Sequence, residues 1–221
     1  MVTDMTMLYH VADLHRSFRI HRAVVNVIDG LSVDIPEGCW FALVGRSGSG
    51  KTTLLQLLGG LDRANSGTLL YRGCDLMKMG GRALAALRRH DFGFVFQSYH
   101  LLPELTALEN AALPATGWGD DRAAAYRRAE ALLRGFGLGG RLGHRPAELS
   151  GGEQQRIAIA RALINEPPVI LADEPTGNLD CASASQVVSI FRELRQAGKT
   201  IVMVTHDPAI AAMADDSFRL S

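Results

Sequence analysis

Short apolar runs recur along this chain, each followed by a polar turn and then by a stretch with helical spacing. This alternation predicts an α/β core, because a mainly parallel sheet needs helices to cover its apolar strands. The candidate buried strands are residues 40–44, 92–96, 169–172 and 200–205. Ligands bind beyond the carboxyl ends of strands in such folds, so the polar residues that follow these runs are the first candidates for a site.

The remaining segments are of two kinds. Residues 8–34 alternate apolar and polar positions over short stretches, which predicts shorter strands in a small antiparallel layer at the N-terminus. Residues 98–165 are rich in Ala, Leu, Arg and Glu, and helices are expected over residues 121–134 and 151–163. We therefore expect one domain over residues 1–221, with a core formed by residues 1–97 and 166–221 and an inserted helical subdomain over residues 98–165.

Composition narrows the partners and the compartment. The 221 residues are 47% hydrophobic, which suffices for a buried core, and 23 basic residues balance 23 acidic ones. We expect no nucleic-acid partner, because no overall positive field would attract one. Cys39, Cys74 and Cys181 form neither a CxxC pair nor a disulfide pattern, which indicates a reducing, cytoplasmic compartment. No apolar run approaches the ~20 residues that cross a bilayer, and the N-terminus lacks the apolar stretch of a secretory signal.

One segment between the run at 40–44 and an apolar helix from Thr53 fits the pattern G-x-x-x-x-G-K-[S/T]. Its residues are Gly45, Arg46, Ser47, Gly48, Ser49, Gly50, Lys51 and Thr52. The glycines let backbone N–H groups turn toward phosphates at a helix N-terminus. Lys51 adds a positive charge, and the Thr52 hydroxyl suits Mg²⁺, which prefers hard oxygen ligands. The pattern predicts a P-loop that binds ATP and Mg²⁺, with Thr53 among the nucleotide-binding residues; a plain glycine-rich turn is the alternative.

Two carboxylates follow the apolar run at 169–172. Asp173 would organise the Mg²⁺ shell, and Glu174 would act on the attacking water as a general base. Acids after a buried strand are often helix caps or turn residues, but a P-loop in the same chain favours the catalytic interpretation. The expected fold is therefore an α/β P-loop NTPase core with an N-terminal antiparallel layer and inserted helices.

A second phosphate-binding pattern lies far from the P-loop in the sequence. Residues 149–156 read LSGGEQQR, which resembles the LSGGQ signature of ABC ATPases. A serine and two glycines at a helix N-terminus are suited to an anion. In that family two subunits pack head to tail, and each signature completes the partner's P-loop site. The resemblance implies a homodimer in which Ser150, Gly151 and Gly152 contact the partner's ATP.

Other motifs of the family follow in order along nearly the whole chain. Gln97 resembles the Q-loop glutamine, which implies contact with Mg²⁺ and the attacking water, and residues 178–180 resemble the D-loop. His206 resembles the switch histidine. The implied catalytic set is Lys51, Gln97, Glu174 and His206, and the implied metal set is Thr52, Gln97 and Asp173. Phe18 is the candidate for stacking on adenine, with a buried core phenylalanine as the alternative.

Within the family, residues 57–62, 100–110 and 172–180 resemble the lipoprotein-releasing and macrolide-export group. The resemblance implies an ATPase subunit, peripheral on the inner face of the cell membrane, that drives export or release of a lipoprotein, peptide or drug through a separate permease subunit. Docking of that permease is expected on Tyr99, Leu101, Leu102 and Leu105, with packing inside the helical insertion as the alternative.

Other functions of such a cassette are less well supported. An ATPase of the FtsE type, which regulates a cell-division membrane complex, is the alternative that sequence separates poorly from a transporter. Nucleic-acid-directed cassettes usually carry a second cassette or basic extensions, which are not seen here. A non-enzymatic scaffold is disfavoured because Lys51, Asp173, Glu174 and His206 are all present.

Overall fold

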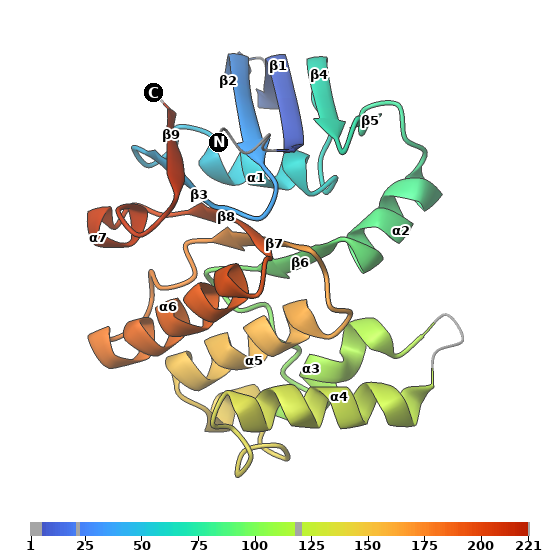
Figure 1. Cartoon of the computed structure of the whole chain (residues 1–221), viewed down its shortest axis with the longest axis vertical. Helices are drawn as coiled ribbons and strands as arrows, with labels where there is room; N and C mark the ends of the chain where they lie inside the picture. Colours follow the sequence, from blue (N-terminus) through green and yellow to red (C-terminus); the bar gives the residue numbers. More distant parts are fainter. Residues whose placement is uncertain (1–5, 21–22, 118–120, 221) are drawn as a thin grey trace.

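A five-stranded parallel sheet, in the order β6-β7-β8-β3-β9, forms the centre of the molecule (Figure 1). The computed structural model describes residues 6–20, 23–117 and 121–220. The strands are β3 Trp40–Gly45, β6 Phe92–Val95, β7 Val169–Asp173, β8 Thr200–Val204 and β9 Asp216–Leu220. Four of them match the predicted apolar runs to within a residue or two, whereas β9 was not expected. The predicted α/β fold class is confirmed.

A second, antiparallel sheet has the order β2-β1-β4-β5. Its strands are β1 Met7–Ile20, β2 Ala23–Pro36, β4 Ser66–Tyr71 and β5 Cys74–Asp75. The prediction of shorter strands over residues 8–34 was wrong in length, because β1 and β2 each run for 14 residues. Register shifts interrupt their pairing, one of them between Val11 and Leu14, and these irregularities break the alternation that marks a long strand.

Helix α1, Lys51–Leu58, lies between the two sheets (Figure 1). It begins directly after the P-loop, and Leu54, Leu55, Leu57 and Leu58 are buried. Apolar residues from both sheets surround it in one hydrophobic cluster. Because α1 is fixed on both sides, its N-terminus holds a constant position at the end of β3.

The other helices are α2 Gly81–His90, α3 Ala107–Ala112, α4 Arg122–Gly135, α5 Gly151–Leu163, α6 Cys181–Gln196 and α7 Pro208–Ala211, with 3₁₀ turns at Leu113–Ala115 and Pro146–Glu148. Of these, α5, α6 and α7 pack against the parallel sheet, α2 lies at its β6 edge, and α3 and α4 lie beyond α5 and pack on it (Figure 1). Helix α5 belongs to two hydrophobic clusters. Ile159 packs with the parallel sheet and α6, whereas Ile157 packs with α3 and α4. The helical layer therefore shares its central helix with the core.

Within the part of the chain that the structure describes, no helix combines the length and the apolar character needed to span a membrane. The prediction that the N-terminus lacks a secretory signal concerns a segment whose first residues, 1–5, lie outside the described residues.

Candidate nucleotide-binding site

The P-loop joins β3 to α1, and close backbone packing explains two of its glycines. A Cβ at Gly45 would lie 2.4 Å from the carbonyl oxygen of Leu220 on β9. A Cβ at Gly50 would lie 2.6 Å from the carbonyl oxygen of Val27 on β2. Both glycines also have positive φ angles, of 154° and 91°, which other residues rarely adopt. Glycine at these positions lets the loop pass between the two sheets.

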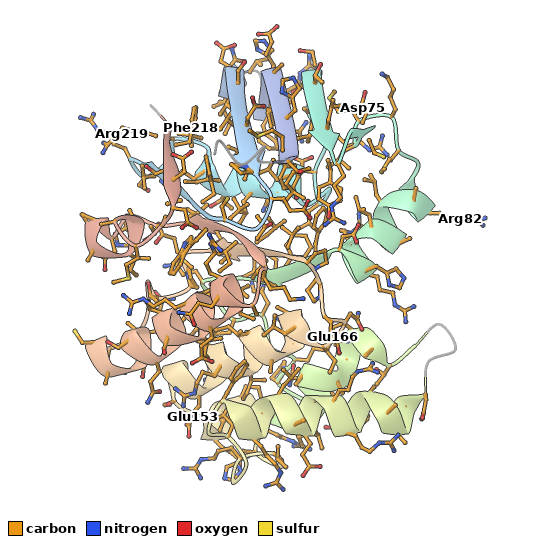
Figure 2. All side chains as sticks on the ribbon, viewed as in Figure 1. Asp75, Arg82, Glu153, Glu166, Phe218 and Arg219 are labelled. Carbon is orange, nitrogen blue, oxygen red and sulfur yellow. The ribbon has the colours of Figure 1, made fainter. Side chains whose placement is uncertain are left out.

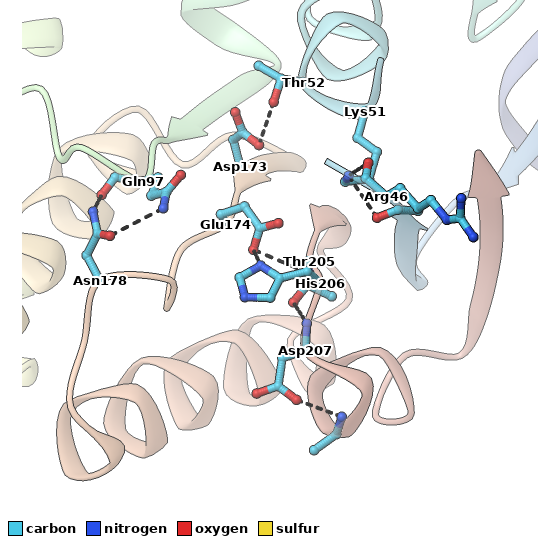
Figure 3. Close-up of polar contacts among 12 residues, drawn as sticks. Arg46, Lys51, Thr52, Gln97, Asp173, Glu174, Asn178, Thr205, His206 and Asp207 are labelled. Atoms are coloured by element: carbon cyan, nitrogen blue, oxygen red, sulfur yellow. Dashed lines mark hydrogen bonds and ion pairs between the residues drawn. The ribbon is translucent and has the colours of Figure 1, made fainter. Parts of the chain in front are cut away.

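Lys51 is folded back onto the loop (Figure 3). Its ammonium group donates hydrogen bonds to the carbonyl oxygens of Gly45, at 3.0 Å, and Arg46, at 2.8 Å. The side chain is buried, and no ion pair with a carboxylate involves it anywhere in residues 6–20, 23–117 or 121–220. Its charge is therefore available to an anion that enters the loop.

Thr52 and Asp173 bring two oxygen ligands together at the start of α1. The Thr52 hydroxyl donates to Asp173 Oδ1 at 3.1 Å. Burial raises the pKa of Asp173, while the bond from Thr52 opposes this rise. A hydroxyl and a carboxylate at hydrogen-bond distance, beside a phosphate loop, fit the hard-oxygen coordination of Mg²⁺. A cation there would favour the charged form of Asp173.

Glu174 and His206 form the second polar pair (Figure 3). Glu174 Oε2 lies 2.8 Å from His206 Nδ1 and accepts the His206 backbone N–H at 3.4 Å. The Glu174 backbone is in the left-handed region, with φ of 46°, and its N–H donates to the carbonyl oxygen of Val204. The strained backbone turns the carboxylate away from β7 and toward the end of β8. One carboxylate is thus held at a fixed place beside the P-loop.

Gln97 is held by Asn178, a residue 81 positions later in the chain. Gln97 Nε2 donates to Asn178 Oδ1, and Asn178 Nδ2 donates to the Gln97 backbone carbonyl, both at 3.3 Å (Figure 3). The neighbouring Gly177 packs closely against this pair, since a Cβ there would lie 3.0 Å from Gln97 Nε2 and would require the Gln97 side chain to shift. These contacts join the segment after β6 to the segment after β7.

Most of the predicted site residues line one pocket of about 630 Å³. Its lining residues are Val27, Ser47, Gly48, Gly50, Lys51, Thr52, Thr53, Gln97, Asp173, Glu174, Val204 and His206. Gly45 and Arg46 line the adjoining pocket on the far side of the loop, and Ser49 faces β2. Val27 and Val204 were not predicted, because apolar strand residues carry no signal that they border a site.

Phe18 does not line this pocket. It lies on β1, half-buried, with the Arg16 guanidinium 4.3 Å from the ring centre. The side chain is also absent from the buried core residues, so the alternative of a core phenylalanine does not describe it. Its role in stacking on adenine stays a prediction.

The three predicted signature residues lie away from the pocket. Ser150 caps α5: its side chain accepts from the Glu153 N–H at 3.3 Å, and Glu153 accepts the Ser150 N–H at 2.8 Å. Figure 2 labels Glu153 at this end of α5, on the helical side of the molecule. Gly151 and Gly152 open the helix. One chain therefore does not bring its own signature to its own P-loop.

The segment after Gln97 contains a buried residue whose role sequence analysis missed. Asn110, in α3, is fully buried. Its amide nitrogen donates to the carbonyl oxygens of Leu102, Leu105 and Thr106, each at 3.0 Å, and its oxygen accepts the Leu102 N–H at 2.8 Å. This side chain fixes the loop on which permease docking was predicted. A single asparagine in a helix-forming stretch gives no signal of such a role.

Comparison with known proteins decides the family. The family described as "ABC transporter" matches residues 28–177, which include the P-loop, both carboxylates and the signature. The chain belongs to the ABC transporter family. This ABC cassette is 49% identical over 211 residues to the macrolide export ATP-binding/permease protein MacB of Shigella sonnei and of Escherichia coli K12. It is 48% identical over 207 residues to MacB 1/2 of Paracoccus denitrificans.

These matches cover 94–96% of this chain but only 31–33% of the relatives. The ABC cassette thus spans about a third of the length of the curated proteins that it matches. Two solved structures of the bacterial cassette MJ0796 superpose on it, each with a TM-score of 0.89 and 34% identity over 96% of this chain and 94% of the other. One is a dimer, and the other is a dimeric post-hydrolysis state bound to ADP and Pi. By family and fold this chain is an ATP-binding ABC ATPase.

Proposed function

We propose that this chain binds ATP with Mg²⁺, forms a homodimer with two composite sites, and uses ATP hydrolysis to drive a membrane permease. The export or release of a lipoprotein, peptide or drug is the corresponding transport reaction. One observation carries the proposal: Lys51, the Thr52–Asp173 pair and the Glu174–His206 pair all line one pocket, whereas the signature of the same chain lies outside it.

The pocket has the groups that hydrolysis needs. Lys51 would transfer its hydrogen bonds from the loop carbonyls to the phosphates, and Thr52 and Asp173 would hold Mg²⁺. The bound cation would neutralise charge on the β- and γ-phosphates. Glu174 would take a proton from the attacking water, and His206 would orient the carboxylate through Nδ1. Gln97 would report the state of this site to the segment that follows it.

A second copy of the chain would complete each site. The N-terminus of α5 presents a serine and two glycines that do not line the P-loop pocket of the same chain, so it suits an anion bound to another subunit. Head-to-tail packing of two copies about a two-fold axis puts each signature opposite the other copy's P-loop and closes the assembly. The dimeric MJ0796 cassettes support the assembly of two copies.

The permease would dock beside the loop after Gln97, with the cassette held at the inner face of the membrane. Leu102 is exposed, while Leu101 packs against the helical cluster, so the four predicted docking residues do not contribute alike. Next to this loop lies a pocket of about 460 Å³ whose lining includes Phe94, Phe96 and His100. The combined ATP-binding and permease character of the MacB relatives supports such a partner.

Replacement of Glu174 by glutamine tests the hydrolytic role. The variant should keep ATP binding, lose about two to four decades of turnover, and accumulate as an ATP-bound dimer, since the amide cannot accept a proton. Glu193→Gln, at an exposed position of α6, is the matched control and should hydrolyse normally. Release of phosphate and gel filtration with ATP are the measurements. Normal turnover by Glu174→Gln would remove Glu174 from this role.

The transport role needs a separate test. Glu174→Gln trapped with ATP in solubilised membranes should retain its permease, which mass spectrometry then identifies. A membrane protein with few spans and a large extracytoplasmic domain would support export or release. A cell-division membrane protein would instead support the regulatory alternative.

A further inference from the structure

Tyr99, two residues after Gln97, lies against the start of the signature helix. A Cβ built at Gly151 would be 2.8 Å from the Tyr99 hydroxyl oxygen and 3.7 Å from the ring carbon that carries it. The half-buried ring therefore occupies the space into which a side chain at Gly151 would point. The hydroxyl has no hydrogen-bond partner among the residues that the structure describes, so packing alone holds it there.

The backbone of Tyr99 is held by the other end of the same helix. Arg161, ten positions after Gly151 in α5, donates to the carbonyl oxygen of Tyr99 at 2.7 Å and to that of His100. Tyr99 and His100 both have left-handed backbones, with φ of 59° and 49°, which non-glycine residues adopt at a cost. The two bonds from Arg161 offset part of this cost and hold the backbone of both residues in place.

The Arg161 side chain donates its hydrogen bonds to these two backbone carbonyls. Burial lowers the pKa of its guanidinium, and Arg161 forms no ion pair with a carboxylate among the residues that the structure describes. A desolvated cation gains most from strong acceptors nearby, and here these acceptors are the backbone oxygens of Tyr99 and His100. Both ends of helix α5 therefore contact the loop after Gln97, one through Gly151 and the other through Arg161.

The signature is also held from its other side. A Cβ at Gly152 would lie 2.3 Å from Ser183 Oγ, and this hydroxyl donates to Asp180 at 2.7 Å. Gln97 in turn binds Asn178, two positions before Asp180. The loop after Gln97, the signature and the segment 178–183 thus form a closed ring of contacts. Displacement of Tyr99 would leave the signature supported on one side only.

We propose that Tyr99 is a positioning residue that sets the place of the signature loop, with Arg161 fixing its backbone. The proposal rests on the proposed function in one respect, that the signature acts on the partner subunit's ATP. A movement imposed on the loop after Gln97 then alters the nucleotide site of the other subunit, through Tyr99 and Gly151, as well as its own through Gln97.

A double-mutant cycle tests the contact itself. Gly151→Ala should reduce turnover about tenfold, because its Cβ meets the Tyr99 hydroxyl. Tyr99→Phe in the same chain should restore most of this loss, because the remaining 3.7 Å to the ring carbon is an ordinary contact. ATP binding to the monomer should be unchanged in Gly151→Ala, in Tyr99→Phe and in the double variant. Equal losses in Gly151→Ala with and without Tyr99→Phe would overturn the proposal.

Mixed subunits test the direction of the effect. Tyr99→Ala should lose ATP-driven dimerisation and turnover, and mixing it with Lys51→Ala should restore activity. In the mixed dimer the intact P-loop of the Tyr99→Ala subunit faces the intact signature of the Lys51→Ala subunit. If Tyr99 acted instead on its own P-loop through Gln97, that pairing would stay inactive, and the proposal would fail.

ATP turnover by the unmodified chain and by Tyr99→Ala separates the inference from the proposed function. Absence of ATP turnover by the unmodified chain would refute the proposed function, whereas normal turnover with a fully active Tyr99→Ala variant would refute the inference alone.

The role of Arg161 has its own test. Arg161→Lys keeps the charge but cannot donate to both carbonyls in a fixed geometry. It should reproduce the Tyr99→Ala defect in part, with ATP binding to the monomer retained; full activity of Arg161→Lys would remove Arg161 from the proposal.

Discussion

Gly45 illustrates how single residues determine the shape of the P-loop. Residues other than glycine rarely adopt its φ of 154°. A Cβ at this position would also lie only 2.4 Å from the carbonyl oxygen of Leu220. Gly45→Ala should therefore displace β9 or the loop, with an expected loss of about 2–3 kcal/mol in the free energy of unfolding. Denaturation by urea measures this loss.

Gly48 gives a matched comparison within the same loop. It has a positive φ of 81°, but a Cβ there would meet nothing within 4 Å. Gly48→Ala should cost only about 1 kcal/mol, the cost of the left-handed backbone. Equal losses in the two variants would show that backbone strain, and not contact with β9, makes Gly45 necessary.

Local sequence patterns indicated the candidate site residues, but they did not indicate which residues of other elements those side chains contact. The P-loop and the pair of acids after β7 are each contiguous in sequence, so the chemistry of each segment suggests its role. The bond between Gln97 and Asn178 and the contact between Gly152 and Ser183 join segments from different elements. No spacing rule predicts such contacts, because they depend on how helices pack on the sheet.

At the scale of elements, Asp215 connects one helix and two strands. Its carboxylate accepts from Arg195 on α6 at 2.6 Å and from the backbone N–H of Trp40 on β3 at 2.7 Å, just before β9 begins. The hydrogen bond from Arg195 lowers the pKa of Asp215. A lowered pKa means that the folded state favours the charged carboxylate.

The stability that Asp215 contributes should therefore depend on pH. It is fully present above the unfolded pKa of about 3.9 and is lost as the pH falls through the lower pKa of the folded state. Asp215→Asn should cost about 1 kcal/mol at pH 7, since solvent screens this half-exposed pair. Thermal unfolding followed by circular dichroism should show a smaller difference from the unmodified chain near pH 3. A difference that does not change with pH would assign the effect to shape rather than charge.

Elements with uninterrupted apolar sequence were the ones predicted closely. Strands β3, β7 and β8 are buried on both faces, so their residues form continuous runs. Strand β9 has only one fully buried residue, Leu220, and pairs with β3 at the edge of the sheet. Its mixed sequence resembles that of a loop, and its strand conformation depends on the pairing partner that the fold supplies.

At the scale of the whole molecule, Ser150 offers a test of the dimer that preserves the monomer. Aspartate caps helices about as well as serine, so Ser150→Asp should keep α5 intact. Its negative charge would face the partner's triphosphate, and ATP-driven dimerisation should weaken about a hundredfold because like charges meet at the interface. Light scattering with ATP, in the Glu174→Gln background, measures this effect.

Ser150→Asn is the control, because asparagine caps the helix without adding charge. It should dimerise far better than Ser150→Asp. Equal dimerisation of the two variants would argue against a signature that faces the phosphates of a second subunit.

Helix α5 also determines how far the molecule can be divided. Because Ile159 lies in the core of the parallel sheet and Ile157 in the helical cluster, the two clusters meet along one helix. Excision of residues 98–165 would remove side chains from the sheet and leave the excised fragment with an exposed apolar face. The helical layer therefore cannot be exchanged as an independent module, because the α5 that it carries must also pack against the apolar residues of the sheet and of α6.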